Sequence, residues 1–332
     1  MMWAEFAVCG ALLVTSAYAL CKEGMALSAV THIEEGVIGI FFLAVATSFP
    51  EIVVGISSVY HLGSVALGYG DLVGSVMINS MLLIGVDYMA GRGRVLAGAS
   101  KMNFTTVFLW GIAGAVIVSS ALVRKRFSLF SIGPLGVESF IILGLYFVYL
   151  AGLKRTSSGD ISIKKNIKIP VGGSLASRGN AVMWIRFTFL LFIVMILGIW
   201  MATLGEKISA STGLSHTFVG GTLLALVTSF PEIAVTFAAI RSGSIEMALG
   251  NIFGSNLFDL SILPFLDVLT KEPITVFLTA GQIAATAVAV IIPIILLLGM
   301  RVRDNTRQKV GFDTSMIFTA ALAALAILYF VE

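Results

Sequence analysis

Hydrophobic and polar positions are grouped along the chain in long blocks. Runs of mostly apolar residues, each about as long as a helix that crosses a bilayer core of roughly 30 Å, are separated by short polar breaks. We therefore predict ten membrane-spanning helices. They cover residues 2–20, 36–60, 64–90, 102–121, 133–153, 182–204, 216–240, 244–269, 274–299 and 313–331. Because the apolar runs are continuous, they favour helices over a β-barrel.

The composition agrees with a membrane protein. Hydrophobic residues make up 58% and charged residues 12% of the 332 residues, and the mean hydropathy is +1.01, whereas soluble domains contain about 25% charged residues. The first apolar run follows no basic segment, so we interpret it as a span and not as a cleaved signal peptide. The two cysteines, Cys9 and Cys21, form no metal or redox motif, and we expect free thiols.

The positive charges indicate how the chain is oriented in the membrane. If successive connections between the ten spans lie on opposite sides, 16 of the 21 Lys and Arg residues fall on one side and 5 on the other. Because cytoplasmic loops carry the excess of Lys and Arg, we predict that both termini face outward across the cell membrane. The net charge of +3 comes from these loops, and we expect the lipid bilayer, and no nucleic acid, as a partner.

Two sequence blocks occur twice. Residues 46–51 read ATSFPE and residues 227–232 read VTSFPE, while DLVGSVMIN at 71–79 matches NIFGSNLFD at 251–259. A polar stretch, 154–181, separates the two copies, and five spans precede it, so the second copy enters the membrane in the opposite direction. We predict an all-α membrane fold of two inverted five-helix repeats, 1–153 and 182–332, joined by a cytoplasmic linker.

Ionisable residues fall in the middle of these repeated segments. Glu51, Glu232 and Asp259 lie near the centres of predicted spans, and Asn79 occupies the position that matches Asp259. Charged side chains are costly in a bilayer and usually face a wet cavity or a partner. Hydroxyls lie one helical turn away, on Thr47, Thr228, Ser75 and Ser255.

The ligand types in this set indicate a hard cation. Pro50 and Pro231 lack amide protons, so each kinks its helix and frees a carbonyl one turn earlier. Carboxylate, hydroxyl, amide and carbonyl oxygens without His or Cys are typical of Ca²⁺ or Na⁺ sites. Two ionised glutamates would balance one Ca²⁺ or two Na⁺.

The repeated blocks resemble a known family. Residues 36–90 and 216–269 are similar to the α-1 and α-2 repeats of the cation/calcium antiporter superfamily, and most similar to its sodium/calcium exchanger branch. The resemblance implies a secondary active antiporter that exchanges Ca²⁺ for Na⁺ by alternating access at a midplane site, with no enzymatic activity and no cofactor. Its implied Ca²⁺ ligands are Glu51, Glu232 and the carbonyls of Thr47 and Thr228. Its implied Na⁺ ligands are the Ala44 and Ala225 carbonyls with Ser75 and Ser255, while Asn79 and Asp259 line the centre.

The chain departs from the family pattern at two positions. Asp71 stands where the family usually has Asn, and Val76 stands where the second repeat has Asn256. Asp71 adds a carboxylate that would change ion selectivity, proton coupling or helix-end packing, so H⁺/Ca²⁺ exchange remains an alternative. Ser48 and Ser229, within the repeated TSFPE sequence, are further candidate site residues.

Residues 68–71, GYGD, suggest two other functions. A potassium-channel filter would need a preceding Thr-Val, but Ala66 and Leu67 precede this segment. An intramembrane aspartyl protease of the GxGD type would need a second aspartate in a Tyr-Asp motif, which the sequence lacks. We further expect Asp87 to lie in water at a helix end.

Overall fold

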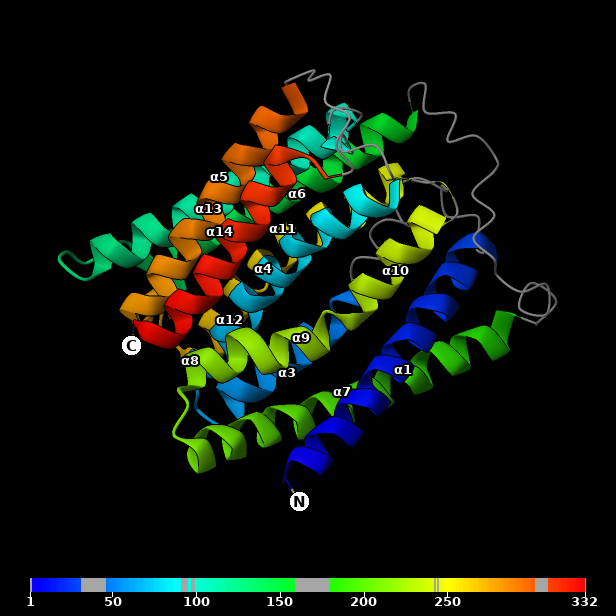
Figure 1. The fold of residues 1–332 in the computed structure, drawn as a ribbon. Helices are drawn as coiled ribbons and strands as arrows, with labels where there is room; N and C mark the ends of the chain where they lie inside the picture. Colours follow the sequence, from blue (N-terminus) through cyan, green and yellow to red (C-terminus); the bar gives the residue numbers. More distant parts are fainter. Residues whose placement is uncertain are drawn as a thin grey trace.

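The computed structural model describes residues 2–30, 46–90, 95–96, 99–158, 180–241, 243, 245–301 and 310–331 (Figure 1). The first half of the chain contains α1 (Met2–Val30), α3 (Phe49–Tyr60), α4 (Val65–Ala90), α5 (Lys101–Arg124), the antiparallel pair β1 (Ser131–Ile132) and β2 (Leu135–Gly136), and α6 (Val137–Ser158). The second contains α7 (Asn180–Thr212), α8 (His216–Val219), the π-helix η2 (Gly220–Leu224), α9 (Ala225–Thr228), α10 (Phe230–Arg241), α11 (Ile245–Ser261), α12 (Leu263–Thr270), the 3₁₀-helix η3 (Ile274–Val276), α13 (Ala280–Arg301) and α14 (Phe312–Phe330).

A largely helical membrane fold is confirmed. Among the described residues, seven helices are long and apolar enough to cross a membrane, or eight if the bent pair His216–Thr228 and Phe230–Arg241 is one span. The remaining two predicted spans, 36–60 and 133–153, overlap the shorter apolar helices Phe49–Tyr60 and Val137–Gly152. Because residues 31–45 lie outside the described part, the count of ten stays a prediction.

Three helices extend well beyond the ends of the predicted spans. Helix α1 continues to Val30, α7 continues to Thr212, and α6 continues to Ser158, inside the stretch predicted as a linker. Residues 159–179 of that linker lie outside the described residues. The apolar pattern locates the part of a helix that meets lipid, whereas a helix can continue into water with polar side chains.

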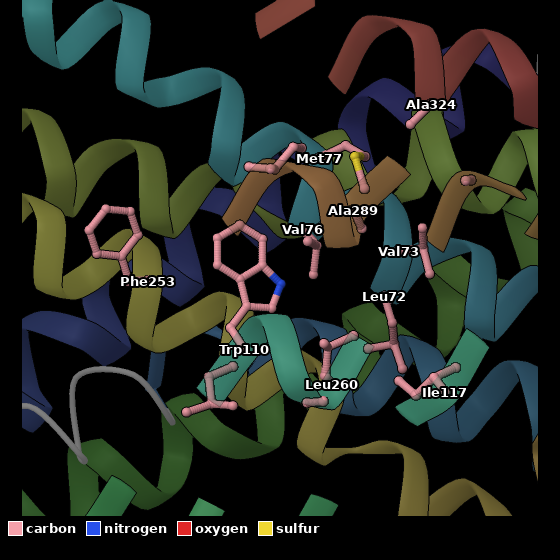
Figure 2. Packing of buried hydrophobic residues seen from close by; sticks show 14 of the residues in the cluster. Leu72, Val73, Val76, Met77, Trp110, Ile117, Phe253, Leu260, Ala289 and Ala324 are labelled. Carbon is pink, nitrogen blue, oxygen red and sulfur yellow. The ribbon is translucent and has the colours of Figure 1, made fainter. Parts of the chain in front are cut away.

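Two groups of helices surround the repeated segments. Helices α1 and α7 pack together and contact α3 and α10, on one side of the molecule (Figure 1). On the other side, α5, α6, α13 and α14 pack with α4 and α11, which carry the DLVGSVMIN and NIFGSNLFD sequences. Leu72, Val76, Trp110, Phe253 and Leu260 belong to the apolar core of this second group (Figure 2).

Helix α4 packs backbone to backbone against α8 and η2. Gly70 and Gly74 are four residues apart and therefore share one face of α4. A Cβ atom at Gly74 would overlap the backbone of Gly221, and one at Gly70 would lie 2.8 Å from the carbonyl oxygen of Thr217. Small residues permit this close approach between helices in membranes. The contact places the polar residues of α4 beside the segment that leads to the second TSFPE motif.

Asp87, near the end of α4, is fully buried, so the prediction that it lies in water is wrong. Its Oδ1 atom accepts a hydrogen bond from the amide of Val95 at 3.0 Å. Its Oδ2 atom accepts from the amide of Gly311 at 3.0 Å and from the hydroxyl of Thr314 at 2.6 Å, where α14 begins. The carboxylate thus satisfies amide groups that burial would otherwise leave without partners.

Asp267 repeats this arrangement in the second half. Its Oδ1 atom accepts from the amide of Ile274 at 2.7 Å, and its Oδ2 atom accepts from the amide of Gly136 at 3.3 Å and the hydroxyl of Ser139 at 2.5 Å. Each aspartate therefore holds the start of a helix in the opposite half of the sequence. The partners also form a short repeated motif, GVES at 136–139 and GFDT at 311–314, which the sequence comparison of the longer blocks missed.

Candidate cation-binding site

Each TSFPE sequence forms a break between two helical segments. Ser48 (φ −86°, ψ 11°) and Ser229 (φ −79°, ψ 0°) have nearly the same non-helical backbone conformation, and Pro50 and Pro231 follow. In the second half the flanking helices are bent by 43°. A π-helix precedes that bend at η2, and π-helical segments are frequent at functional sites. The predicted proline kink is therefore present at this position.

The breaks place acidic residues in the interior. Glu51 lies in the first turn of α3 and Glu232 in the first turn of α10, while Asp71 lies in α4 and Asp259 in α11. All four side chains are fully buried. Glu51 interacts electrostatically with the other three, so the four carboxylates form one group.

The two glutamates exchange hydrogen bonds between the halves. The Ser48 hydroxyl donates to Glu232 Oε1 at 3.1 Å, and the repeat-related Ser229 hydroxyl donates to Glu51 Oε1 at 3.4 Å. Each glutamate also accepts a hydrogen bond within its own half. These donors are Ser75, at 3.4 Å from Glu51 Oε1, and Ser255, at 3.5 Å from Glu232 Oε1. The Thr47 side chain also hydrogen-bonds to Glu232.

Thr228 has several neighbouring oxygen atoms. Its Oγ1 atom lies 3.2 Å from Asp71 Oδ1 and 3.4 Å from Ser75 Oγ. It also lies 3.2 Å from each of the carbonyl oxygens of Leu224 and Ala225. The Ala225 carbonyl, predicted as a Na⁺ ligand, accepts the amide of Ser229 at 3.0 Å.

Several buried oxygen atoms in this group accept no hydrogen bond from the described residues. They are Oε2 of Glu51, Oε2 of Glu232, Oδ2 of Asp71 and Oδ1 of Asn79. A buried polar atom without a partner costs about 1–3 kcal/mol. Such atoms, facing other acidic groups, are suited to binding a cation.

The ligand set for a cation would be mixed. Among the described residues, no group of three or more His, Cys, Asp or Glu side chains is arranged to hold a metal ion. Among the described residues, the largely buried guanidinium of Arg124 is paired with Glu138, not with any of these four carboxylates. A cation bound here would therefore need hydroxyl and carbonyl oxygens in addition to the carboxylates, as the sequence predicts.

The structure brings together most of the predicted site residues. Direct contacts connect Glu51, Glu232, Ser75, Ser255, Thr228 and Thr47, and they include Ser48, Ser229 and Asp71. Asn79 and Asp259 are buried in the same helices as Ser75 and Ser255. Ala44 lies outside the described residues.

Sequence reasoning missed one residue that supports this site. The Asn251 side-chain amide donates to the Glu232 carbonyl at 3.2 Å and to the Thr236 hydroxyl at 3.0 Å. Asn251 occupies the position in the second sequence block that matches Asp71 in the first. This match could have identified Asn251 as a candidate site residue. Residues 68–71 are helical, so the GYGD sequence does not form the extended carbonyl filter of a potassium channel.

Comparisons with known proteins agree with these features. A family model described as "Sodium/calcium exchanger protein" matches residues 1–154 and 182–331. The chain is 26% identical to the inner membrane protein YrbG of Escherichia coli (strain K12) over 233 residues, which cover 68% of this chain and 67% of YrbG. It is 25% identical to the putative antiporter CaxA of Alkalimonas amylolytica over 254 residues, which cover 75% and 74% of the two chains.

A solved structure shows the same fold. The sodium-calcium exchanger NCX_Mj superposes with a TM-score of 0.60 at 20% sequence identity, over 98% of this chain and 97% of that one. The family consists of transporters rather than enzymes. Since the family model matches most of the chain, over residues 1–154 and 182–331, the chain belongs to the sodium/calcium exchanger family of the cation/calcium antiporter superfamily and is a multi-pass membrane protein.

Proposed function

We propose that this protein is a secondary active antiporter that exchanges cytoplasmic Ca²⁺ for external Na⁺ across the cell membrane. The observation that carries the proposal is the reciprocal pairing of Glu51 and Glu232. Each is fully buried, each accepts a serine hydroxyl from the other half, and each keeps one oxygen without a hydrogen-bond partner. Duplicated motifs thus supply two equivalent carboxylates to one site.

The charge of this pair accounts for exchange. Two ionised glutamates carry the charge that one Ca²⁺ or two Na⁺ would neutralise, and an unpaired buried charge costs several kcal/mol. The empty site is therefore unfavourable, and the two cations compete to neutralise the charge of the same two glutamates. The proposed Ca²⁺ ligands are Glu51, Glu232 and the carbonyls of Thr47 and Thr228. The proposed Na⁺ ligands are the carbonyls of Ala44 and Ala225 with Ser75 and Ser255, and Asn79 and Asp259 line the centre.

An inverted repeat supplies a route for alternating access. In the proposed architecture, ten spans form two five-helix repeats of opposite orientation, with both termini outside and the site where the repeats meet. The exchanged hydrogen bonds of Ser48 and Ser229 support a twofold relation between the halves. Contacts of this kind are expected when equivalent segments face each other at a shared site.

The ion pair can be tested in proteoliposomes. We expect radiolabelled Ca²⁺ uptake to be driven by an outward Na⁺ gradient and to fall to background in Glu51→Gln and Glu232→Gln, because each variant removes one of the two charges. Glu246→Gln, a carboxylate that bonds Ser100 and Asn103 away from the site, is the matched control. Wild-type uptake in both site variants would overturn the assignment.

A second candidate function is H⁺/Ca²⁺ exchange at the same site. It is favoured by Asp71, a fourth buried carboxylate where the family pattern has Asn. The same proteoliposomes distinguish the two functions, because uptake driven by a pH gradient, and not by a Na⁺ gradient, would establish the proton as the exchanged ion.

A further inference from the structure

Asp71 breaks the symmetry of the two polar faces at the site. Helix α4 carries Asp71, Ser75 and Asn79 at intervals of four residues, and α11 carries Asn251, Ser255 and Asp259 at the related positions. Each face therefore has one carboxylate, but at opposite ends of the motif. All six side chains are buried.

The two residues at the first position make different contacts. Asn251 donates hydrogen bonds to the Glu232 carbonyl and the Thr236 hydroxyl, both in its own half. In the first half Gly55 occupies the position of Thr236, and an ionised carboxylate has no proton to donate to a carbonyl. Asp71 instead accepts a hydrogen bond from Thr228 of the opposite half at 3.2 Å.

The contact with Thr228 affects a predicted Na⁺ ligand. A threonine hydroxyl has one proton, and Asp71 Oδ1, the Leu224 carbonyl and the Ala225 carbonyl all lie 3.2 Å from Thr228 Oγ1. When the proton points to Asp71, the Ala225 carbonyl loses the hydroxyl and keeps the hydrogen bond from the Ser229 amide. Its second lone pair is then available to a cation.

The number of buried carboxylates also indicates a second cation. Asp71 interacts electrostatically with Glu51, Glu232 and Asp259, whereas the largely buried Arg124 side chain is paired with Glu138. One Ca²⁺ at the two glutamates would leave the Asp71 charge without a partner. Its Oδ2 atom is buried and accepts no hydrogen bond within the described part of the chain.

We propose that Asp71 forms a separate Na⁺ position beside the pair Glu51 and Glu232, completed by the hydroxyls of Ser75 and Thr228. A single carboxylate with two hydroxyls matches a hard monovalent cation in charge and in ligand type. This inference rests on the proposed function and extends it, because it assigns one Na⁺ of the exchange cycle to a residue outside the duplicated glutamates.

The test measures the two cations separately on purified full-length protein in detergent. Equilibrium binding of radiolabelled Ca²⁺ is titrated with Na⁺, and radiolabelled Na⁺ binding is counted, for wild type, Asp71→Asn and the control Glu246→Gln. In Asp71→Asn we expect Ca²⁺ affinity without Na⁺ to stay within about threefold of wild type. The Na⁺ concentration that displaces half of the Ca²⁺ should rise about tenfold, as loss of a charged ligand predicts, and one fewer Na⁺ should bind.

The outcomes separate this inference from the proposed function. Unchanged Na⁺ displacement in Asp71→Asn would overturn the separate Na⁺ position, and so would loss of Ca²⁺ binding together with Na⁺ binding. If Asp71→Asn does not fold, Asp71→Ser is measured in the same way. Ca²⁺ binding that survives intact in Glu51→Gln would instead refute the proposed site, whatever the result at Asp71.

Discussion

At the scale of single residues, the site depends on serines that reach across from one repeat to the other. Ser48 and Ser229 adopt the same backbone conformation before the two prolines, and each hydroxyl bonds the glutamate of the opposite half. A hydrogen bond to a charged group contributes about 1.5–3 kcal/mol. The serines therefore orient both carboxylates, and the second oxygen of each is available to the proposed cation.

Replacing either serine should weaken Ca²⁺ binding to a similar degree. We expect Ser48→Ala and Ser229→Ala each to raise the Ca²⁺ dissociation constant about tenfold, because each removes one charge-assisted hydrogen bond. The measurement is equilibrium Ca²⁺ binding, with Ser261→Ala as the control because that hydroxyl bonds the Phe258 carbonyl of its own helix. A large effect in one serine variant and none in the other would argue against reciprocal roles.

The identity of the site residues could be predicted from the sequence, but their hydrogen-bond partners could not. Glu51, Glu232 and their neighbouring hydroxyls were predictable, because an acidic residue in a duplicated apolar segment is costly without a function. The partner of each hydroxyl was not predictable. Helical spacing placed Thr47 beside Glu51, whereas its side chain hydrogen-bonds to Glu232, since that contact depends on how the two halves pack.

At the scale of helices, two sets of contacts hold the repeated segments in place. One is the close contact of α4 with η2 at Gly74 and Gly221, and the other is the pair of aspartates that bind the starts of α6 and α14. Sequence patterns predicted where the membrane helices lie but not these contacts. The prediction that Asp87 lies in water was wrong because the sequence around a polar residue near the end of an apolar run looks the same in both cases. It does not show whether water or buried amide groups surround the side chain.

A side chain at Gly74 should disrupt the site from a distance. In Gly74→Ala, the added Cβ would overlap the Gly221 backbone, so α4 and η2 must separate and Ser75 must shift. We expect the thermal unfolding midpoint in detergent to fall by several degrees, as overpacking of about 1–3 kcal/mol predicts, and Ca²⁺ transport to be lost. Gly144→Ala is the matched control, because an added Cβ there meets nothing within 4 Å.

The two aspartates should contribute similarly to stability. Asp87→Ala and Asp267→Ala each leave two amides and one hydroxyl without their carboxylate partner. We expect each variant to lower the free energy of unfolding by roughly 3 kcal/mol, measured as a drop in the thermal midpoint. Equal midpoints in wild type and both variants would show that these carboxylates do not hold the helix starts in the membrane protein.

At the scale of the whole molecule, the two repeats are expected to face opposite sides of the membrane. The distribution of Lys and Arg predicts that both termini lie outside and that the region between the proposed repeats lies in the cytoplasm. We predict that epitope tags at either end bind antibody on intact cells. A tag inserted between residues 159 and 179 should bind only after the cells are permeabilised, and binding to it on intact cells would reverse the orientation.

The proposed function requires Glu51 and Glu232 to form one cation site, and a double-mutant comparison of Ca²⁺ binding distinguishes one shared site from two independent ones. Equilibrium binding is measured on purified wild type, Glu51→Gln, Glu232→Gln and the double variant. For a single shared site, each single variant should lose binding about as completely as the double variant, because the remaining glutamate cannot hold the ion alone. Single variants that each keep part of the binding, with losses that add in the double variant, would contradict the account.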